Sequence, residues 1–270
     1  MTERRLPVYF ISHGGGPWSF MDDASRAPYV ALSRELADMP RQVGTTPKAI
    51  LMISAHWETP EFTLTSNPRP PMIYDYGGFP DYTYRIRYDA PGDPDLAARV
   101  QAMIVAAGMP ARLDSERGFD HGAYTPLHVM YPRADVPVVQ LSLKRGLDPE
   151  THLALGRALR PLRDEGVLII GSGFTTHGLP FLTDPSPGAR PPGWSTEFDA
   201  WAAECFAAGD LDSLIDFRAK APGMPYAHPT IEHFAPLFVT LGAAGDPQQP
   251  PTQVIDGYWM GLAKRSIQMA

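Results

Sequence analysis

Short, uninterrupted apolar runs recur along the chain, and segments with helical spacing of apolar residues separate them. Such runs are typical of strands that are covered on both faces. We predict strands at residues 8–12, 48–55, 62–65, 83–88, 136–143 and 167–172. The segments between them predict helices at residues 29–39, 94–107, 123–130, 151–163, 196–207 and 230–241. This alternation predicts an α/β fold with a mostly parallel central sheet flanked by helices.

The length of the chain fits one such sheet. At 270 residues, a single domain spanning residues 1–270 buries a large core without a second domain. The 30 prolines are spread among the apolar segments, so we interpret them as rigid loops and not as disorder. The proline-rich stretch of residues 183–193 predicts a surface loop or the rim of a lid.

Charge and cysteine content exclude several classes of function. The net charge of -7 and the pI of about 5.6 argue against a surface that binds nucleic acid. Cys205 is the only cysteine, which excludes an internal disulfide and a cysteine-based zinc site and suits a reducing cytoplasm. The apolar runs are too short for a membrane span or a signal-peptide core. We therefore expect a cytoplasmic protein without nucleic-acid or membrane partners.

Three of the predicted strands are each followed by a histidine. His13 follows residues 8–12, His56 follows residues 48–55, and His177 follows residues 167–172. Ligands of open α/β sheets bind beyond the carboxyl ends of the strands. We therefore expect these imidazoles to converge in one pocket, which is the pattern of a metal site. The alternative for His13 and for His56 is a histidine that is hydrogen-bonded within a turn.

The three glycines after His13 indicate what kind of ligand this loop binds. Gly14, Gly15 and Gly16 let the backbone pass close to a bound ion or substrate, because they have no Cβ atoms. A phosphate-binding loop is the competing interpretation. The lysine and the hydroxyl residue that complete such a loop are absent, so we favour the ion or substrate.

His121 lies in a loop that leads into a predicted helix. We expect Asp120, which precedes it, to cap the helix or to hold the imidazole in one tautomer. A capping loop without a catalytic role is the alternative. His128 and His152 occupy helical positions without glycine neighbours, and we interpret them as surface or packing residues.

His228 and His233 lie five residues apart, which is about 140° around a helix, so they cannot share one helical face. Pro229 suits a first helical turn. We therefore predict His228 before the helix and His233 inside its opening turn, where it is held rigidly enough to bind a metal.

Taken in order, six motifs resemble those of class III extradiol ring-cleaving dioxygenases, in particular the 4,5-DOPA extradiol dioxygenase-like branch. The resemblance extends from about Pro7 to Met260. The motifs are His13-Gly14-Gly15-Gly16-Pro17, Ser54-Ala55-His56-Trp57, Gly77-Gly78-Phe79-Pro80, Gly118-Phe119-Asp120-His121-Gly122, Gly171-Ser172-Gly173 with Thr176-His177, and His228-Pro229 with Glu232-His233-Phe234 and Pro236-Leu237.

The resemblance implies a catechol and dioxygen as substrates and iron(II) as the working metal. It also implies a role for each motif histidine. The metal ligands would be His13, His56 and His233, the acid/base residue would be His177, and the residues that contact the substrate would be His121 and His228.

This sequence has His233 where many class III enzymes have a glutamate ligand. We expect the adjacent Glu232 to point away from the pocket, because neighbouring helical residues diverge by about 100°. Three neutral imidazoles leave the metal with its full double charge, which favours capture of zinc(II) during purification.

Two other functions compete with ring cleavage. Three histidines and an exchangeable water also describe a zinc-dependent hydrolase of an amide or ester. A binding module without activity is the third interpretation, and the retention of all six motif histidines argues against it.

Several aromatic residues are candidates for a pocket that holds a flat ring, and each is equally suited to packing in the core. They are Trp18, Phe20, Tyr76, Phe79, Tyr124 and Tyr226.

Overall fold

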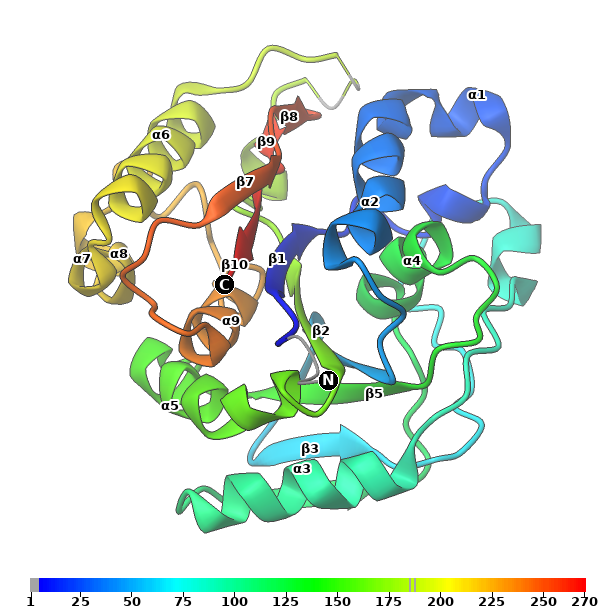
Figure 1. The fold of residues 1–270 in the computed structure, drawn as a ribbon. Coiled ribbons are helices and arrows are strands. Elements are labelled where there is room, and N and C mark those ends of the chain that lie inside the picture. The colour runs from blue at the N-terminus through cyan, green and yellow to red at the C-terminus, as the bar shows by residue number, and fades with distance from the viewer. Residues whose placement is uncertain (1–4, 185, 187) are drawn as a thin grey trace.

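An eight-stranded sheet runs through the centre of the computed structural model, which describes residues 5–184, 186 and 188–270 (Figure 1). The strand order is β4-β3-β5-β2-β6-β1-β10-β7. The four central strands are parallel to one another: β5 (Val138–Lys144), β2 (Ala49–Thr59), β6 (Val167–Gly173) and β1 (Val8–Ser12). The predicted α/β fold with a mostly parallel sheet is confirmed.

Antiparallel pairings extend the sheet at both sides. β3 (Phe62–Thr65) pairs antiparallel with β5 and parallel with β4 (Ala111–Asp114). On the other side, β10 (Ser266–Met269) pairs with β1 and with β7 (Thr252–Ile255). A separate hairpin consists of β8 (Tyr258–Trp259) and β9 (Leu262–Ala263).

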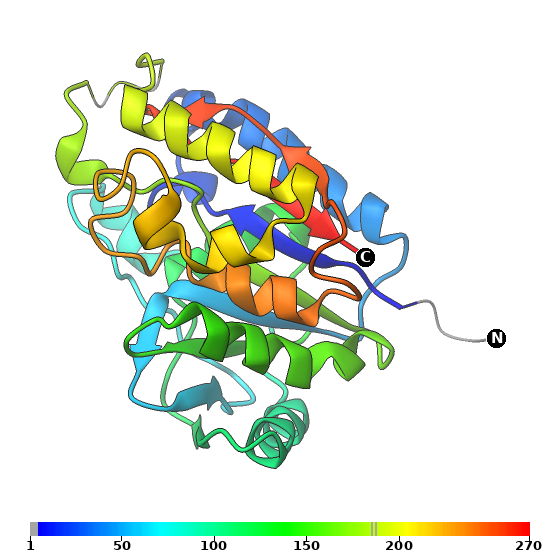
Figure 2. The same cartoon turned by 90° about the vertical axis from the view of Figure 1, so that its left-hand side faces the viewer.

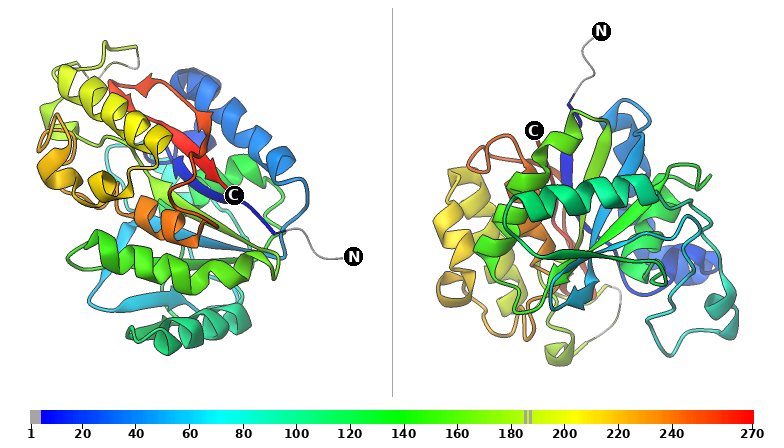
Figure 3. Two further views of the ribbon diagram at one scale, coloured as in Figure 1. Left: turned by 60° about the vertical axis from the view of Figure 1, so that its left-hand side comes forward. Right: turned by 90° about the horizontal axis from the view of Figure 1, so that it is seen from below.

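Helices cover both faces of the sheet, because the side chains of each central strand alternate between two apolar cores. In β1, Val8 and Phe10 enter one core and Tyr9 and Ile11 enter the other. The first core is covered by α3 (Pro94–Ala106), α5 (Pro149–Leu159), α6 (Gly193–Ala208) and α9 (Pro236–Ala243), and the second by α2 (Val30–Val43) and α4 (His121–Met130). Figure 2 shows α6, α9 and α5 along one face, and Figure 3 shows α3 beside β3.

Short helical segments occupy several of the connections. The α-helical ones are α1 (Asp23–Arg26), α7 (Leu211–Ile215) and α8 (Phe217–Lys220). The 3-10 helices are η1 (Trp18–Phe20), η2 (Ala27–Tyr29), η3 (Asp81–Arg85), η4 (Arg160–Arg163) and η5 (Leu179–Phe181).

The predicted strand at residues 83–88 was wrong, because residues 81–85 form η3. Its tyrosines favour strands in general, but β propensity depends on a partner strand. Here the Tyr76 hydroxyl donates a hydrogen bond to the Thr83 carbonyl at 2.6 Å, which stabilises the helical turns of η3. The prediction also missed β4, β7, β8, β9 and β10, which are short and lack long apolar runs.

The helix predicted at residues 230–241 begins later, at Pro236. Proline suits this position because its fixed φ angle is helical and its missing N–H is not needed there. Residues 231–235 form turns in which Phe234 and Ala235 both donate their N–H groups to the Ile231 carbonyl, at 3.1 Å each. His233 therefore lies in a turn and not in a helix, contrary to the prediction.

Some sequence-based expectations fall partly outside the described residues. Residues 1–4 belong to the predicted single domain of residues 1–270, and residues 185 and 187 belong to the predicted loop at 183–193. Among the described residues, none of the helices has the length and apolar character that crossing a membrane requires. Cys205 is buried and free.

Candidate metal centre and active site

The pairing between three central strands ends at one level, although β2 itself continues past it to Thr59. Ser12 at the end of β1 pairs with Gly173 of β6, and Ser54 of β2 pairs with Ser172. His13 follows β1 directly. His56 lies within β2, where the pairing with β5 shifts its register. The sheet therefore brings these histidines to one edge, as the sequence predicts.

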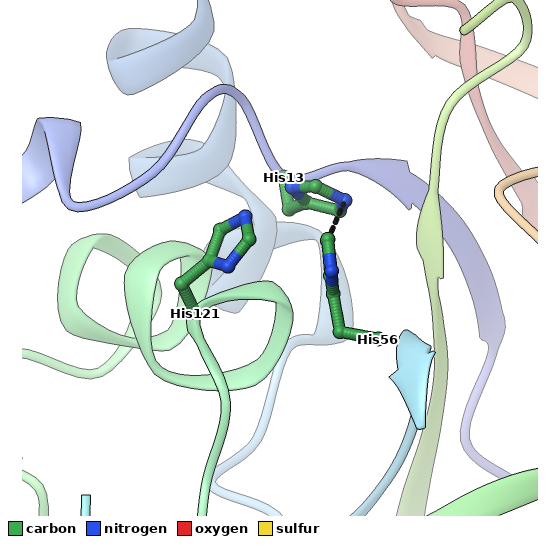
Figure 4. A group of neighbouring side chains, drawn as sticks. All are labelled: His13, His56 and His121. Carbon is green, nitrogen blue, oxygen red and sulfur yellow. Dashed lines mark hydrogen bonds between the residues drawn. The ribbon is translucent and has the colours of Figure 1, made fainter. Parts of the chain in front are cut away.

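The imidazoles of His13 and His56 face each other through their Nε2 atoms, which lie 3.3 Å apart (Figure 4). The Nδ1 of His13 is 2.7 Å from the Gly14 carbonyl and must donate to it, which leaves a lone pair on Nε2. Two imidazole nitrogens that bind one ion at about 2.1 Å lie about 3.0 to 3.4 Å apart. The observed separation fits a shared metal ion.

His233 has a third ring nitrogen with a lone pair that is available to bind a metal. Its Nδ1 lies 2.8 Å from Oε1 of Glu232, so it donates to the carboxylate. Its Nε2 is buried and has no hydrogen-bond partner among the described residues. The His233 ring centre lies 5.4 Å from that of His13 and 4.9 Å from that of His56, and the latter two are 5.0 Å apart. The three rings therefore lie close together, while the potential ligand atoms of His233 group with those of His177 and Glu232.

His121 and His177 complete a group of five histidines. The ring centre of His121 lies 4.0 Å from that of His56 and 5.2 Å from that of His13. His177 stacks on His233 with ring centres 3.4 Å apart and an angle of 14°. The potential ligand atoms fall into two sets, His13 with His56 and His121, and His177 with Glu232 and His233.

The contact between Glu232 and His233 corrects one expectation from the sequence. Helical geometry predicts that Glu232 points away from the pocket, but these residues lie in turns. The carboxylate therefore reaches Nδ1 of His233. Carboxylates in this position fix the tautomer of a metal-binding histidine and raise its basicity.

The segment that carries His177 runs alongside the segment that carries His233. The N–H of Phe174 donates to the His233 carbonyl at 2.9 Å, and the N–H of His177 donates to the Ala227 carbonyl at 2.8 Å. Gly173 permits this contact, because a Cβ atom there would lie 2.1 Å from the His233 carbonyl oxygen. The close approach of the two backbones stacks the two imidazoles.

His228 lies apart from the five-histidine group. Its Nε2 donates to the Thr175 carbonyl at 2.8 Å, and its ring packs among Phe198, Phe217 and Phe234. The residue is 1% exposed. The hydrogen bond ties His228 to the loop that carries His177.

Asp120 and Asp75 divide the role that the sequence assigns to Asp120 alone. Asp120 caps α4 by accepting a hydrogen bond from the Ala123 N–H, and it also accepts one from Ser54. The His121 imidazole is held instead by Asp75, whose Oδ1 lies 2.9 Å from Nδ1 of His121. Sequence analysis missed Asp75, although it immediately precedes the Tyr76-Gly77-Gly78 segment.

The glycines after His13 make room for aromatic side chains, and the predicted close approach of their backbone to a bound ion or substrate stays a prediction. A Cβ atom on Gly14, Gly15 or Gly16 would collide with the side chains of Trp18, Trp259 and Phe79 respectively. The Trp18 indole also donates to the His13 carbonyl at 2.8 Å. The glycines therefore admit aromatic side chains that fix the His13 loop.

Aromatic rings also border the histidines. Phe174, which the sequence analysis did not single out, places its ring centre 5.2 Å from that of His13, edge to face. The Tyr76 ring centre lies 5.9 Å from that of His121. Of the aromatics proposed as pocket walls, Trp18 and Tyr124 are fully buried, and Tyr226 is 49% exposed.

Burial makes the histidines of the site poor bases. Burial first, and neighbouring imidazoles second, lower the pKa of His56 to about 4 and that of His177 to about 3. Burial first, and neighbouring histidines second, hold the pKa values of His13 and His233 well below the usual range. These four imidazoles are neutral at pH 7 and have lone pairs available for a metal or a proton.

His128 and His152 lie elsewhere, as expected for packing residues. His152 is buried with its ring against Phe62, and its Nδ1 donates to the Asp148 carbonyl at 2.7 Å. His128 stacks on Phe20 with ring centres 3.8 Å apart.

Comparisons with known proteins agree with this geometry. Residues 7–261 match the family described as the catalytic LigB subunit of aromatic ring-opening dioxygenase. A 4,5-DOPA dioxygenase extradiol from Beta vulgaris is 41% identical, over 94% of this chain and 92% of its own length. Another from Escherichia coli K12 is 36% identical, over 100% of this chain and 96% of its own.

A solved structure shares the fold. The crystal structure of uncharacterized protein JW3007 from Escherichia coli K12 superposes with a TM-score of 0.79 and 32% identity, covering 98% of this chain and 100% of that one. The relatives favour ring opening over the zinc hydrolase and the binding module. The chain belongs to the LigB family of aromatic ring-opening dioxygenases, and its enzyme class is that of the extradiol dioxygenases.

Proposed function

We propose that this enzyme is a non-haem iron(II)-dependent dioxygenase that opens the ring of a catechol with dioxygen. The observation that supports the proposal is the closeness of three imidazole rings, those of His13, His56 and His233, whose centres lie within 5.4 Å of one another, with the Nε2 atoms of His13 and His56 3.3 Å apart. We assign the metal to these three residues. Neutral imidazoles suit iron(II) and zinc(II) alike, so zinc is expected in the same place when it is available.

The choice of iron follows from the chemistry of the reaction. When bound, ferrous iron supplies a redox-active centre with open positions for both catechol oxygens and for dioxygen. Zinc has no accessible redox change and is expected to be inactive. The reaction breaks the ring bond next to the hydroxyl pair. The catechol supplies four electrons, and both oxygen atoms enter a muconic semialdehyde.

We assign the proton transfers to His177. Its imidazole is neutral at pH 7 and has a lone pair for the proton of a catechol hydroxyl. Because burial lowers its pKa to about 3, the transfer requires a hydroxyl whose own pKa a bound metal would lower. It returns that proton as the ring opens. The stack on His233 holds the ring of His177 beside the assigned metal ligands, within reach of a hydroxyl that binds there.

We assign His121 to the substrate side of the site. Its ring lies against those of His13 and His56, while Asp75 holds its Nδ1 from behind. For His228, expected from the sequence to contact the substrate, the geometry supports a role through Thr175. The hydrogen bond from His228 supports the loop that presents His177.

We propose a DOPA-like catechol as the substrate. Several relatives that align over most of this chain are named 4,5-DOPA dioxygenase extradiol, which supports this class. We also propose a cytoplasmic enzyme of small molecules without nucleic-acid or membrane partners; the free Cys205 suits a reducing compartment, and the net charge of -7 argues against binding nucleic acid.

Oxygen uptake tests the proposal. The metal-free protein is reconstituted anaerobically with iron(II) or with zinc(II), and then mixed with aerated DOPA, caffeate or protocatechuate. We expect uptake and a yellow product with iron only. Silence with every catechol would contradict the proposal, and metal-dependent ester hydrolysis would favour the zinc hydrolase instead.

A further inference from the structure

We propose that Asp75 is a positioning residue that fixes the tautomers of two histidines at once, so that His56 and His121 both present a bare Nε2 to the site. The inference deepens the proposed function and rests on it for the roles of the two histidines. The sequence motifs give no role to Asp75, and its action is indirect, because it reaches the reacting groups only through the two imidazoles.

One carboxylate contacts both rings. Oδ1 of Asp75 accepts hydrogen bonds from the backbone N–H of His121 at 3.0 Å and from its Nδ1 at 2.9 Å. Oδ2 lies 3.5 Å from Nδ1 of His56. The Asp75 side chain is 21% exposed, and those of His56 and His121 are 20% and 8% exposed. Water therefore competes weakly for these contacts.

The fold delivers this carboxylate through a short pairing next to α4. Met72 forms a bridge with Phe119, and the Ile73 N–H donates to the Phe119 carbonyl at 2.8 Å. Two residues after Phe119 the chain reaches His121, and two residues after Ile73 it reaches Asp75. The pairing brings the two residues together from segments far apart in the sequence.

The Asp75 carboxylate determines which nitrogen of each imidazole carries the proton. An ionised carboxylate only accepts hydrogen bonds, so each imidazole nitrogen that faces it carries the proton. His121 then holds its proton on Nδ1 and keeps a lone pair on Nε2. For His56, the 3.5 Å contact with Asp75 favours the same state against the 3.3 Å contact between its Nε2 and that of His13, which a proton on His56 Nε2 would turn into a hydrogen bond. His13 and His233 reach the same state by donating to the Gly14 carbonyl and to Glu232.

The two carboxylates also change the charge balance expected from the sequence. Three neutral imidazoles leave a divalent ion with its full charge, but Asp75 and Glu232 lie directly behind the rings. Their two negative charges offset the two positive charges of the ion. An outer layer therefore supplies the negative charge that a glutamate ligand supplies in other class III enzymes.

Replacing Asp75 with asparagine separates this role from simple packing. The amide has the same shape, but one of its two polar groups is a donor. If its oxygen stays with His121, its NH₂ group faces Nδ1 of His56. That nitrogen must then accept, and the proton moves to Nε2, where the metal would bind.

Long-range ¹H–¹⁵N spectra of histidine-labelled, metal-free protein at pH 7 test the inference without a catechol or iron. We expect Nδ1–H tautomers for His56 and His121 in the unaltered chain, and at least one Nε2–H tautomer in Asp75→Asn. The affinity for cobalt(II), measured by titration, should fall about 10- to 100-fold. Asp81→Asn, which alters an exposed carboxylate on η3, should change neither result.

Two results would overturn the inference. One is an Nε2–H tautomer at His56 or His121 in the unaltered protein, which needs no variant to fold. The other is an Asp75→Asn protein that keeps both Nδ1–H tautomers and a cobalt affinity within twofold of the original. Failure of oxygen uptake with normal tautomers would count against the proposed reaction and not against the role of Asp75.

Discussion

Lowering the pH from 7 to 5 should strongly destabilise the metal-free protein. Burial lowers the pKa of His56 and His228 to about 4 and that of His177 to about 3 in the folded chain. The unfolded chain has ordinary histidines with a pKa of about 6.5 and takes up protons first. Stability is therefore complete above about pH 6.5 and is lost as the pH falls toward the folded pKa values.

The size of the effect follows from these values. At pH 5, each of the three histidines costs about 2 kcal/mol, because the unfolded chain is protonated and the folded chain is not. Together they cost about 6 kcal/mol, which is comparable with the whole stability of many domains. His13 and His233, whose pKa values are also depressed by burial, act in the same direction.

Urea unfolding at pH 7, 6 and 5 in the presence of a chelator measures this loss through the extrapolated free energy of unfolding. Saturating zinc should reduce the loss, because a metal that binds only the folded imidazoles opposes their protonation. If the free energy of unfolding of the metal-free protein changes by less than about 1 kcal/mol between pH 7 and 5, the burial argument is wrong.

Further variants test individual assignments. His177→Ala should keep the metal but lose turnover, whereas His233→Ala should lose the metal; metal analysis of the purified proteins decides, and equal loss in both would overturn the roles. His121→Ala should also keep the metal, and its loss would instead make His121 a ligand. Glu232→Gln should weaken zinc binding about 10- to 100-fold in a competition titration, and unchanged affinity would refute the role of its carboxylate. Gly173→Ala should lower the free energy of unfolding by about 1 to 3 kcal/mol or more, because a Cβ atom cannot fit beside the His233 carbonyl; an unchanged urea midpoint would contradict this.

The central sheet was predictable because its strands are buried on both faces. Val8–Ser12, Phe62–Thr65 and Val167–Gly173 agree with the prediction to within one residue. Continuous apolar runs carry that information locally. Ala111–Asp114 and Ser266–Met269 do not, because their strand conformation depends on pairing with β3 and with β1.

The site was predictable where a histidine follows a strand. The carboxyl end of β1 fixes the place of His13 without knowledge of any contact. His56 lies within β2, two residues after its pairing with β6 ends, and not after the strand as predicted. Asp75 and Glu232 could not be placed in the same way. Their roles depend on a bridge between Met72 and Phe119 and on turns before α9, both of which arise only from tertiary packing.

Anomalous diffraction at the absorption edge of the bound metal tests the central claim most directly. Crystals of the protein loaded with iron(II) or zinc(II) should show one peak about 2.1 Å from the Nε2 atoms of His13, His56 and His233. A peak bound by His121 in place of His233, or a peak away from these three imidazoles, would contradict the account.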